Sequence, residues 1–298
     1  MSLERICYLV NSSAKGGRSI KIWNQYFEPE LKPRKKDVYF TEKEITEDLT
    51  KSLLDDYDIF VAAGGDGNLR DVTNAIAGTE KVLGILPLGS GNDFYRSLTG
   101  MNSSKNNYGR MIDIIKNRKI SSVDICKVIY GDKERFYTNY LDFGISAEIV
   151  KNLSYGVKKI AGKIAYVVAF LKTFNYRPFE AELKFNSVSI SQKCMLMNVS
   201  NIPSKASWFL FAPGAKINDG YLNVLLADID ILKGLFSLGK ARKGNHIYQE
   251  GISYFSNNHK IKSLEIITEP RVHFAIDGDL AGKTPVKTEV YGKLKILS

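Results

Sequence analysis

The sequence contains little cysteine and no long hydrophobic run. Its 298 residues include three cysteines, Cys7, Cys126 and Cys194, at separations that match no metal-binding motif. This pattern excludes a zinc-finger class of protein and favours free thiols in a reducing compartment. The apolar runs fall short of the roughly 18 residues of a membrane-spanning helix, so no such helix is expected. The N-terminus enters a strand-like run without a secretory signal, which predicts a cytoplasmic protein.

Negative charge is in the minority. Lysine and arginine number 42 against 32 aspartate and glutamate residues, and the formal net charge is +10. Such a balance favours an anionic partner, such as a nucleotide, a nucleic acid or an anionic membrane surface. Zinc-finger spacing, an aromatic RNA-binding signature and a continuous basic arm are missing, so no nucleic-acid partner is expected. A nucleotide and an anionic membrane surface remain as candidate partners.

The most informative stretch is a glycine-rich segment between a predicted strand and a predicted helix. Residues 58–63 form an apolar run, Gly-Gly-Asp-Gly follows at 64–67, and a helical pattern continues through Val72 and Ile76. Glycines permit positive φ angles and remove Cβ atoms that would block a phosphate, while N–H groups at the helix start face the anion. Because a carboxylate such as Asp66 repels phosphate, the pattern favours a magnesium–nucleotide complex. The alternative is an ordinary tight turn.

A second loop repeats this arrangement. The apolar run 83–86 leads into Pro-Leu-Gly-Ser-Gly-Asn-Asp-Phe-Tyr-Arg at 87–96, which turns into another helical pattern. Ser90 and Asn92 carry donors for a phosphate or ribose, and Asp93 stands at the helix start, where it also complements the helix dipole. Two such loops predict a nucleotide-binding site.

The N-terminal part alternates between strands and helices. Strands are predicted at 6–10, 37–40, 58–63 and 83–86, with helices after them that include residues 20–27 and 44–54. This alternation predicts an α/β domain with a doubly wound, mostly parallel sheet over residues 1–122. Ligands of such sheets bind at the carboxyl ends of the strands, where both glycine loops lie.

The pattern changes at about Ser122. Short strand-like segments separated by turn residues follow, at 123–130, 134–141, 179–185, 187–198, 221–227, 261–268, 271–276 and 286–297. They predict a second domain, a mostly antiparallel β-sandwich over residues 123–285. Two segments interrupt it: an amphipathic helix at 157–172 containing Lys158, Lys159 and Lys163, and residues 232–238, followed by Lys240, Arg242 and Lys243. Each either rests on an anionic lipid surface or covers the sandwich with its lysines in water.

Five ordered motifs give the chain a family resemblance. They are 64–67, 87–96, Asn139 to Ala147, Ala212 to Leu222 with its Asp-Gly-Tyr-Leu, and Asp277-Gly278-Asp279. In this order they resemble the diacylglycerol kinase catalytic-domain family, especially the soluble bacterial lipid kinases, with sphingosine kinases as relatives. The resemblance covers nearly the whole length and implies that a C-terminal segment at about 286–298 returns to the first domain.

The resemblance implies a kinase that uses ATP and Mg²⁺ to phosphorylate a lipid hydroxyl, with diacylglycerol as the leading acceptor. Its partners would be ATP, a membrane lipid and, transiently, the anionic inner face of the membrane; a homodimer is left open. The alternatives are a kinase for another hydroxyl compound, namely a sphingoid base, phosphatidylglycerol or a soluble metabolite, and a non-catalytic nucleotide- or lipid-binding module.

The resemblance also implies a set of catalytic carboxylates. Asp277, at the end of an apolar strand, matches the general base that accepts the proton of the lipid hydroxyl. Asp279 replaces a family glutamate and is one methylene shorter. Asp66, Asp93 and Asp124 would complete the network around Mg²⁺, and Asp124 is a charge within an apolar run. Without the resemblance, Asp-Gly-Asp is more typical of a plain hairpin turn.

Nucleotide-binding residues carry over in the same way. The implied set is Asn11, Ser12, Ser13, Ala14, Lys15, Thr41, Gly65, Asp66, Gly67, Asn68, Leu69, Arg70, Asp71 and Ser90. The first loop departs from the family's Asn-Pro-x-Ser-Gly at Ser12 and Lys15, and Lys15 or Arg18 would give the phosphates positive charge. Thr41 is either a nucleotide contact or the N-cap of the helix at 44–54.

Some bacterial members of this family hold a structural Mg²⁺ near the Asp-Gly-x-Leu element. Asp219 and the backbone of Tyr221 match that position. Lys216 stands where another acidic ligand is expected and argues against a metal there. His246, His259 and His273 share no ligand spacing, so no metal or catalytic role is assigned to them.

Overall fold

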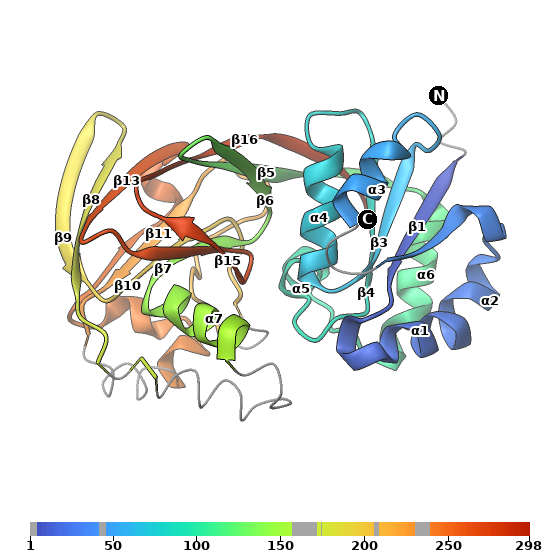
Figure 1. The fold of residues 1–298 in the computed structure, drawn as a ribbon, viewed down its shortest axis with the longest axis horizontal. Coiled ribbons are helices and arrows are strands. Elements are labelled where there is room, and N and C mark those ends of the chain that lie inside the picture. The colour runs from blue at the N-terminus through green and yellow to red at the C-terminus, as the bar shows by residue number, and fades with distance from the viewer. Residues whose placement is uncertain (1–4, 42–45, 157–171, 174, 206–208, 230–238) are drawn as a thin grey trace. The chain divides into compact units, whose positions relative to one another are not determined.

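The computed structural model describes residues 5–41, 46–156, 172–173, 175–205, 209–229 and 239–298 (Figure 1). The chain divides into two compact units, unit 1 with residues 1–125 and 292–298, and unit 2 with residues 126–291. The chain passes between them in β5 (Ile120–Tyr130) and β16 (Val286–Leu297). Among the described residues, no helix has the length and apolar character to cross a membrane.

Unit 1 is built on parallel strands. β2 (Val38–Thr41), β1 (Ile6–Asn11), β3 (Ile59–Gly64) and β4 (Val82–Pro87) pair in this order, and the end of β16 pairs with β4. Every residue of β3 and β4 is buried, as expected for parallel strands covered on both faces. The helices that flank them are α1 (Arg18–Ile22), a π-helical turn (Trp23–Phe27), α2 (Glu28–Leu31), α3 (Thr46–Ser52), α4 (Asp66–Ile76), α5 (Asp93–Thr99) and α6 (Tyr108–Asn117). The predicted α/β class is confirmed.

Unit 2 is an antiparallel sandwich, also as predicted. One sheet has the order β12 (Ile252–Phe255), β11 (Asn223–Ala227), β10 (Leu196–Ser200), β7 (Tyr140–Gly144), β14 (His273–Ile276) and β15 (Asp279–Lys283). The other layer contains β6 (Lys133–Tyr137), β8 (Phe179–Phe185), β9 (Val188–Cys194), β13 (Ser263–Glu269) and parts of β5 and β16. An apolar core that includes Phe143, Phe179 and Phe274 lies between the layers.

Two of the predicted strands are each two strands in the structure. The segment 134–141 is split into β6 and β7, and 187–198 into β9 and β10. In both cases the chain leaves one layer and enters the other, so β6 pairs with β5 whereas β7 pairs with β10 and β14. The apolar pattern continues through each crossing because both layers face the same core, so the sequence alone hides the break.

Among the described residues, the helices α6 and α7 and two short strands were not predicted. α7 (Ile145–Gly156) follows β7 directly, at Gly144, whose φ of +73° turns the chain out of the strand. A Cβ atom built on Gly144 would lie 2.5 Å from the Met195 carbonyl oxygen, so the position requires glycine. The strands β12 and β15, of four and five residues, were also missed. The predicted helix at 157–172, apart from Lys172, and the segment 232–238 lie outside the described residues.

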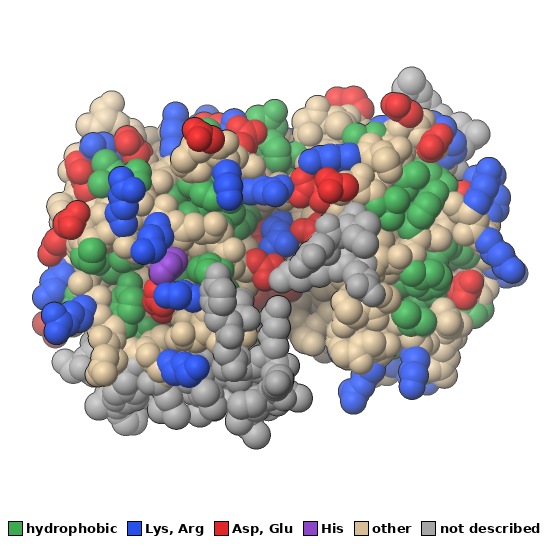
Figure 2. All heavy atoms as spheres, viewed as in Figure 1, with side chains coloured by type: hydrophobic (Ala, Val, Ile, Leu, Met, Phe, Trp, Pro, Cys, Tyr) green, Lys and Arg blue, Asp and Glu red, His purple; other side chains and the backbone are tan. Residues whose placement is uncertain are grey.

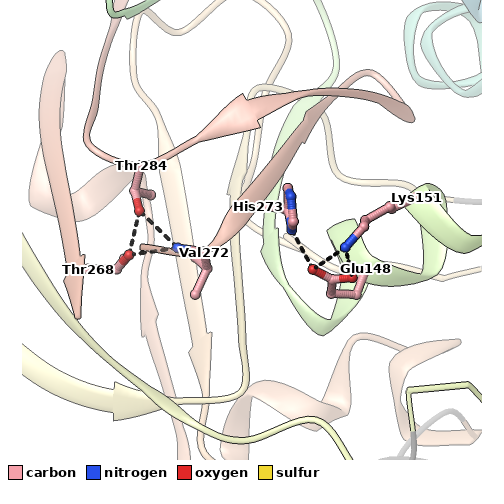
Figure 3. A network of polar contacts seen from close by, with 6 residues as sticks. All are labelled: Glu148, Lys151, Thr268, Val272, His273 and Thr284. Carbon is pink, nitrogen blue, oxygen red and sulfur yellow. Dashed lines mark hydrogen bonds and ion pairs between the residues drawn. The ribbon is translucent and has the colours of Figure 1, made fainter. Parts of the chain in front are cut away.

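Strand β14 is fixed by two polar networks near its start (Figure 3). His273 Nδ1 lies 2.5 Å from Glu148 Oε1 of α7, and Lys151 Nζ lies 3.1 Å from Glu148 Oε2. On the other side, the Val272 N–H donates to the hydroxyls of Thr268 (3.2 Å) and Thr284 (3.1 Å). These contacts tie the start of the strand that leads to Asp277 to α7, to Thr268 of β13 in the other layer, and to Thr284, which follows β15.

Candidate functional site

The two glycine loops of unit 1 are in contact. A Cβ atom added to Gly89 would lie 2.3 Å from the Gly65 Cα, and one added to Gly65 would lie 3.2 Å from the Gly89 Cα. Gly65 has a φ of −96°, and Gly67 lies inside α4, so the prediction that these glycines supply positive φ angles is wrong. Glycine is required because the loops after β3 and β4 pack backbone against backbone.

Asp66 links the loops. It is the first residue of α4, after the N-cap Gly65, and its Oδ2 accepts the N–H of Asn92 at 2.7 Å. Burial raises the pKa of the Asp66 carboxyl to about 6; the charge of Asp93 acts in the same direction, and backbone N–H groups at 92–94 oppose it. Asp66 and Asp93, two of the predicted carboxylates, are therefore close enough to repel one another.

A small pocket lies where the loops meet. Its lining includes Gly64, Gly65, Asp66, Pro87, Asn92 and Tyr95. The Asp66 Oδ1 is buried and has no hydrogen-bond partner among the described residues. Because buried polar atoms without a partner are rare, this pocket suits a ligand that supplies polar or cationic groups. Asp66 is the carboxylate of this lining, and Asp93 is near enough for its charge to raise the Asp66 pKa, so a cation such as Mg²⁺ would stabilise both carboxylates.

The second loop is held closed by its own asparagine. Asn92 has a φ of +56°, and its Nδ2 lies 2.8 Å from both the Gly89 carbonyl oxygen and the Ser103 hydroxyl. The Asn92 amide is therefore occupied by hydrogen bonds within the protein, whereas Ser90 is exposed. Of the two donors proposed from the sequence, Ser90 is the one available to a ligand.

The first loop is shaped by Asn11 at the end of β1. Its Oδ1 accepts the N–H groups of Ser13 and Ala14, both at 3.0 Å. Lys15, Gly16 and Gly17 then have φ angles of +55°, +67° and +82°. Successive residues in left-handed conformations direct backbone N–H groups to the same side, a geometry that suits anions. Lys15 and Arg18 are exposed beside it.

Thr41 lies next to the first loop. Its carbonyl oxygen accepts the Ser12 N–H at 2.9 Å and the Ser12 hydroxyl at 3.1 Å. Thr41 ends β2, α3 begins at Thr46, and residues 42–45 are outside the described part of the chain. The Thr41 hydroxyl is buried and finds no acceptor or donor among the described residues.

Other residues of the predicted set have partners within unit 1. Asn68 Nδ2 donates to the Leu9 carbonyl oxygen at 3.1 Å, and Leu69 is buried. Arg70 Nη2 lies 2.8 Å from Asp71 Oδ1. Asp124 is completely buried, and its Oδ1 lies 2.7 Å from Lys293 Nζ of β16. The structure thus brings Asp66 and Asp93 together and gives Asp124 a lysine partner.

Asp277 lies in unit 2, in the hairpin turn between β14 and β15, with a φ of +49°. Its carboxylate is buried and accepts three backbone N–H groups, from Thr138 at 3.3 Å, Asn139 at 3.1 Å and Tyr140 at 3.0 Å. The β6–β7 crossing thus supplies a row of donors that orients the carboxylate and stabilises its charge. From the sequence, Asn139 and Tyr140 were recognised only as part of a family motif. Nothing in the sequence indicated that their backbone N–H groups donate to the Asp277 carboxylate. Asp279 opens β15 and is partly exposed.

The position proposed for a structural Mg²⁺ has hydrogen bonds of its own. Asp219 Oδ1 accepts the Tyr221 N–H at 3.0 Å, and its Oδ2 accepts Asn257 Nδ2 at 3.3 Å. Lys216 is exposed. Within the described residues, no three His, Cys, Asp or Glu side chains gather as a metal-binding group.

Comparisons with known sequences agree with the motif order. Residues 5–128 match the family model described as "Diacylglycerol kinase catalytic domain", and residues 140–298 match "YegS C-terminal NAD kinase beta sandwich-like domain". A curated Diacylglycerol kinase of Staphylococcus haemolyticus is 28% identical over 259 residues, covering 83% of this chain and 73% of the relative. One from Staphylococcus saprophyticus is 28% identical over 262 residues, covering 83% and 79%.

Solved structures share the fold. A Bacillus anthracis crystal structure superimposes with a TM-score of 0.77 at 22% identity, covering 100% of this chain and 96% of that chain. A diacylglycerol kinase structure from the same organism gives a TM-score of 0.69 at 18% identity, covering 100% and 97%. An NAD kinase from Archaeoglobus fulgidus in complex with ATP gives 0.52 at 13% identity, covering 98% and 93%. The second family model alone spans more than half of the chain, and the first covers most of the remainder, so the protein belongs to the family that joins a diacylglycerol kinase catalytic domain to a YegS-type C-terminal β-sandwich domain.

Proposed function

We propose that this protein is an ATP- and Mg²⁺-dependent lipid kinase that transfers the γ-phosphate to a lipid hydroxyl, with diacylglycerol as the leading acceptor. The observation that carries the proposal is the junction of the two glycine loops around Asp66, whose buried Oδ1 has no partner among the described residues. The α/β domain, residues 1–122 together with about 286–298, binds the nucleotide. Residues 123–285 bind the acceptor.

On the donor side, the first loop and the loops after β3 and β4 bind the phosphates of ATP. The N–H groups of Lys15 and Gly16, the Lys15 ammonium and the Ser90 hydroxyl supply donors and positive charge. Asp66 and Asp93 would hold Mg²⁺, which neutralises charge on the phosphates when bound. The Thr41 hydroxyl, which is buried and has no partner among the described residues, would contact the nucleotide.

On the acceptor side, Asp277 is the general base. As the lipid hydroxyl oxygen forms its bond to the γ-phosphorus, the bond from that phosphorus to the β–γ bridging oxygen breaks and ADP leaves. The hydroxyl proton passes to the Asp277 carboxylate. The three N–H groups from Thr138 to Tyr140 keep this carboxylate oriented before the transfer.

A lipid acceptor requires access to a membrane, and the net charge of +10 suits an anionic surface. The face in Figure 2 carries Lys and Arg interspersed with Asp and Glu, so this view offers no single basic patch. Lys158, Lys159 and Lys163, which we proposed from the sequence as membrane contacts, lie outside the described residues. We propose a protein of the cytoplasm that contacts the membrane transiently. Binding to vesicles should increase with anionic lipid and decrease with salt; equal binding to neutral and anionic vesicles would contradict this part.

The kinase proposal is tested by transfer of radiolabelled phosphate from ATP to a panel of lipids in detergent micelles, with Asp277→Asn beside the wild type. Asn keeps one oxygen, which can accept the N–H groups of Asn139 and Tyr140, but its amide nitrogen would face the Thr138 N–H and it cannot take a proton. We expect kcat to fall by about 10²–10⁴ and the melting temperature to fall slightly, with the calorimetric affinity for ATP–Mg²⁺ nearly unchanged. An Asp277→Asn enzyme with normal kcat, or a wild type that labels no lipid, would refute the proposal.

A further inference from the structure

In unit 2, the sheet that contains β7, β10 and β11 has buried polar side chains on one face. The register places Tyr140, Ser200 and Asn223 in one row across β7, β10 and β11, with Asp142 and Asn198 in the next row. All five are buried, yet none belongs to the apolar core, which takes the alternate residues of the same strands. Burial of polar groups costs free energy unless they are hydrogen-bonded, so a buried polar face indicates a role other than packing the core.

A charged pair stands on this face. Lys205 Nζ forms a short ion pair with Asp142 Oδ1, which also accepts Asn198 Nδ2 at 3.0 Å. The ammonium lies 5.2 Å from the centre of the Tyr140 ring and 4.8 Å from that of Phe211, within range of cation–π attraction. The Asp142 side chain is 2% exposed and that of Lys205 is 16% exposed. The pair therefore presents its positive end to an incoming ligand.

The pair is next to the proposed base. Tyr140 donates its backbone N–H to the Asp277 carboxylate at 3.0 Å, while its ring contacts the Lys205 ammonium. One residue thus joins the two charges. A group bound at Asp277 would be within the electrostatic reach of Lys205, because both lie in the partly desolvated surroundings of the same residue.

A second observation points to a ligand on this face. Asn223 is 1% exposed and its Oδ1 accepts the Tyr254 hydroxyl at 2.9 Å. Its Nδ2 is buried and has no acceptor among the described residues. An amide donor left without an acceptor beside a row of hydroxyl and amide groups suits an oxygen-rich head group.

We infer that Lys205 sets the charge specificity for the acceptor, admitting hydroxyl lipids with a neutral or anionic head group and discriminating against amino alcohols. This inference rests on the proposed function. An ammonium on the acceptor would be attracted by Asp277 but would have to lie beside the Lys205 ammonium, and like charges in a poorly solvated site repel strongly. The uncharged glycerol hydroxyl of diacylglycerol has no such cost.

The test compares diacylglycerol, phosphatidylglycerol and sphingosine as acceptors, each in uncharged detergent micelles, so that membrane charge plays no part. For Lys205→Met we expect the ratio of kcat/KM for sphingosine to that for diacylglycerol to rise about tenfold, with a loss for phosphatidylglycerol. Lys205→Arg should keep the wild-type ratio.

Lys127→Met is the matched control. Lys127 is 15% exposed, forms ion pairs with Glu134 at 3.4 Å and Glu289 at 3.2 Å, and lies 4.9 Å from the Tyr291 ring. Its loss should leave the ratio unchanged. If Lys205→Met does not fold, the double variant Asp142→Asn/Lys205→Met, which leaves no unpaired charge, should raise the ratio by a smaller factor, because no free Asp142 carboxylate then attracts the sphingosine ammonium.

The outcomes separate the two hypotheses. Labelled diacylglycerol with an unchanged ratio in Lys205→Met, or a wild type that prefers sphingosine, would overturn the role of Lys205 and leave the kinase proposal standing. A wild type that binds ATP but labels none of the three acceptors would remove the lipid kinase proposal, and this inference with it.

Discussion

The backbone N–H of Asn92 donates to the carboxylate of Asp66 at 2.7 Å, so one hydrogen bond joins the loop after β4 to the helix that follows β3. The same carboxylate is desolvated and lies within the field of Asp93. An ionised Asp66 is therefore unfavourable in the protein without a ligand, and a bound cation would relieve this cost. Sites that bind charged ligands commonly carry such a destabilising group.

Asp66→Asn is expected to stabilise the protein at neutral pH. The folded-state pKa of about 6 exceeds the ordinary aspartate value of 3.8, so the stability contributed by the protonated carboxyl is complete below about pH 4 and is lost as the pH rises through 6. Asn removes this loss, and we expect a gain of about 1–3 kcal/mol at pH 7 that shrinks toward pH 4. Urea unfolding across this range is the measurement.

The same variant should bind ATP–Mg²⁺ more weakly, because Asn is a poorer ligand for the cation. Asp58→Asn, at a carboxylate paired with the exposed Arg5, provides a control that should show neither effect. A destabilised Asp66→Asn at pH 7 would contradict the raised pKa, and unchanged affinity would remove Asp66 from the metal site.

Gly89→Ala should disrupt the contact between the loops. Its Cβ would meet the Gly65 Cα at 2.3 Å, a backbone clash that cannot be relieved by side-chain rotation. We expect a loss of about 1–3 kcal/mol in the free energy of unfolding and weaker ATP binding by calorimetry. Gly109→Ala in α6, where a Cβ meets nothing within 4 Å, should leave both unchanged. Normal ATP affinity in Gly89→Ala would show that the loop contact is not part of the site.

Glu148→Gln should weaken the attachment of α7 to β14. Burial raises the pKa of Glu148, but hydrogen bonds from Lys151 and His273 and their charges outweigh this and lower it overall. A lowered pKa means that the stabilisation is present above the unfolded pKa, about 4.3, and is lost as the pH falls further. We expect Glu148→Gln to cost about 1–2 kcal/mol at pH 6–7 and less near pH 4.

Exposed Glu265 in β13 supplies the comparison for this pH series, since Glu265→Gln should change stability little at any pH. If the two variants lose the same stability at pH 7, or if the difference grows as the pH falls, the contribution of the Glu148–His273 contact would be disproved.

The sequence predicted the α/β unit well because its signals are local. Buried strands such as 58–63 end at a glycine loop, and the helix that follows has its own period, so each element is visible within a dozen residues. The contact between Gly65 and Gly89 was not visible, because it depends on β3 and β4 being neighbours in the sheet. The sequence therefore identified two loops that meet in the fold, but the positive φ angles expected for the glycines of the first loop are wrong, and the close contact explains Gly65 and Gly89 instead.

The surroundings of Asp277 show the same limit. The Asp-Gly-Asp turn was recognisable, but the three N–H groups that it accepts come from the crossing between β6 and β7, some 137–139 residues earlier in the chain. Periodicity could not reveal that crossing, because Tyr137 and Leu141 both face the apolar core. The long-range hydrogen bonds of Asp277 and the partners of Lys205 could be identified only from the three-dimensional structure.

A single substitution at Thr41 tests whether the first loop is part of the nucleotide site. Its hydroxyl is buried and unpartnered among the described residues, next to the first loop, so a bound nucleotide would supply the missing partner. Valine has nearly the same shape and lacks the hydroxyl. We expect Thr41→Val to lower the affinity for ATP–Mg²⁺ about 3–10-fold while leaving the melting temperature the same or slightly higher, because an unsatisfied buried hydroxyl is removed.

Thr73→Val is the matched control: the Thr73 hydroxyl, in α4, is also buried without a partner among the described residues, and its side chain is completely buried. Equal ATP affinity in the two variants would exclude a contact between Thr41 and the nucleotide.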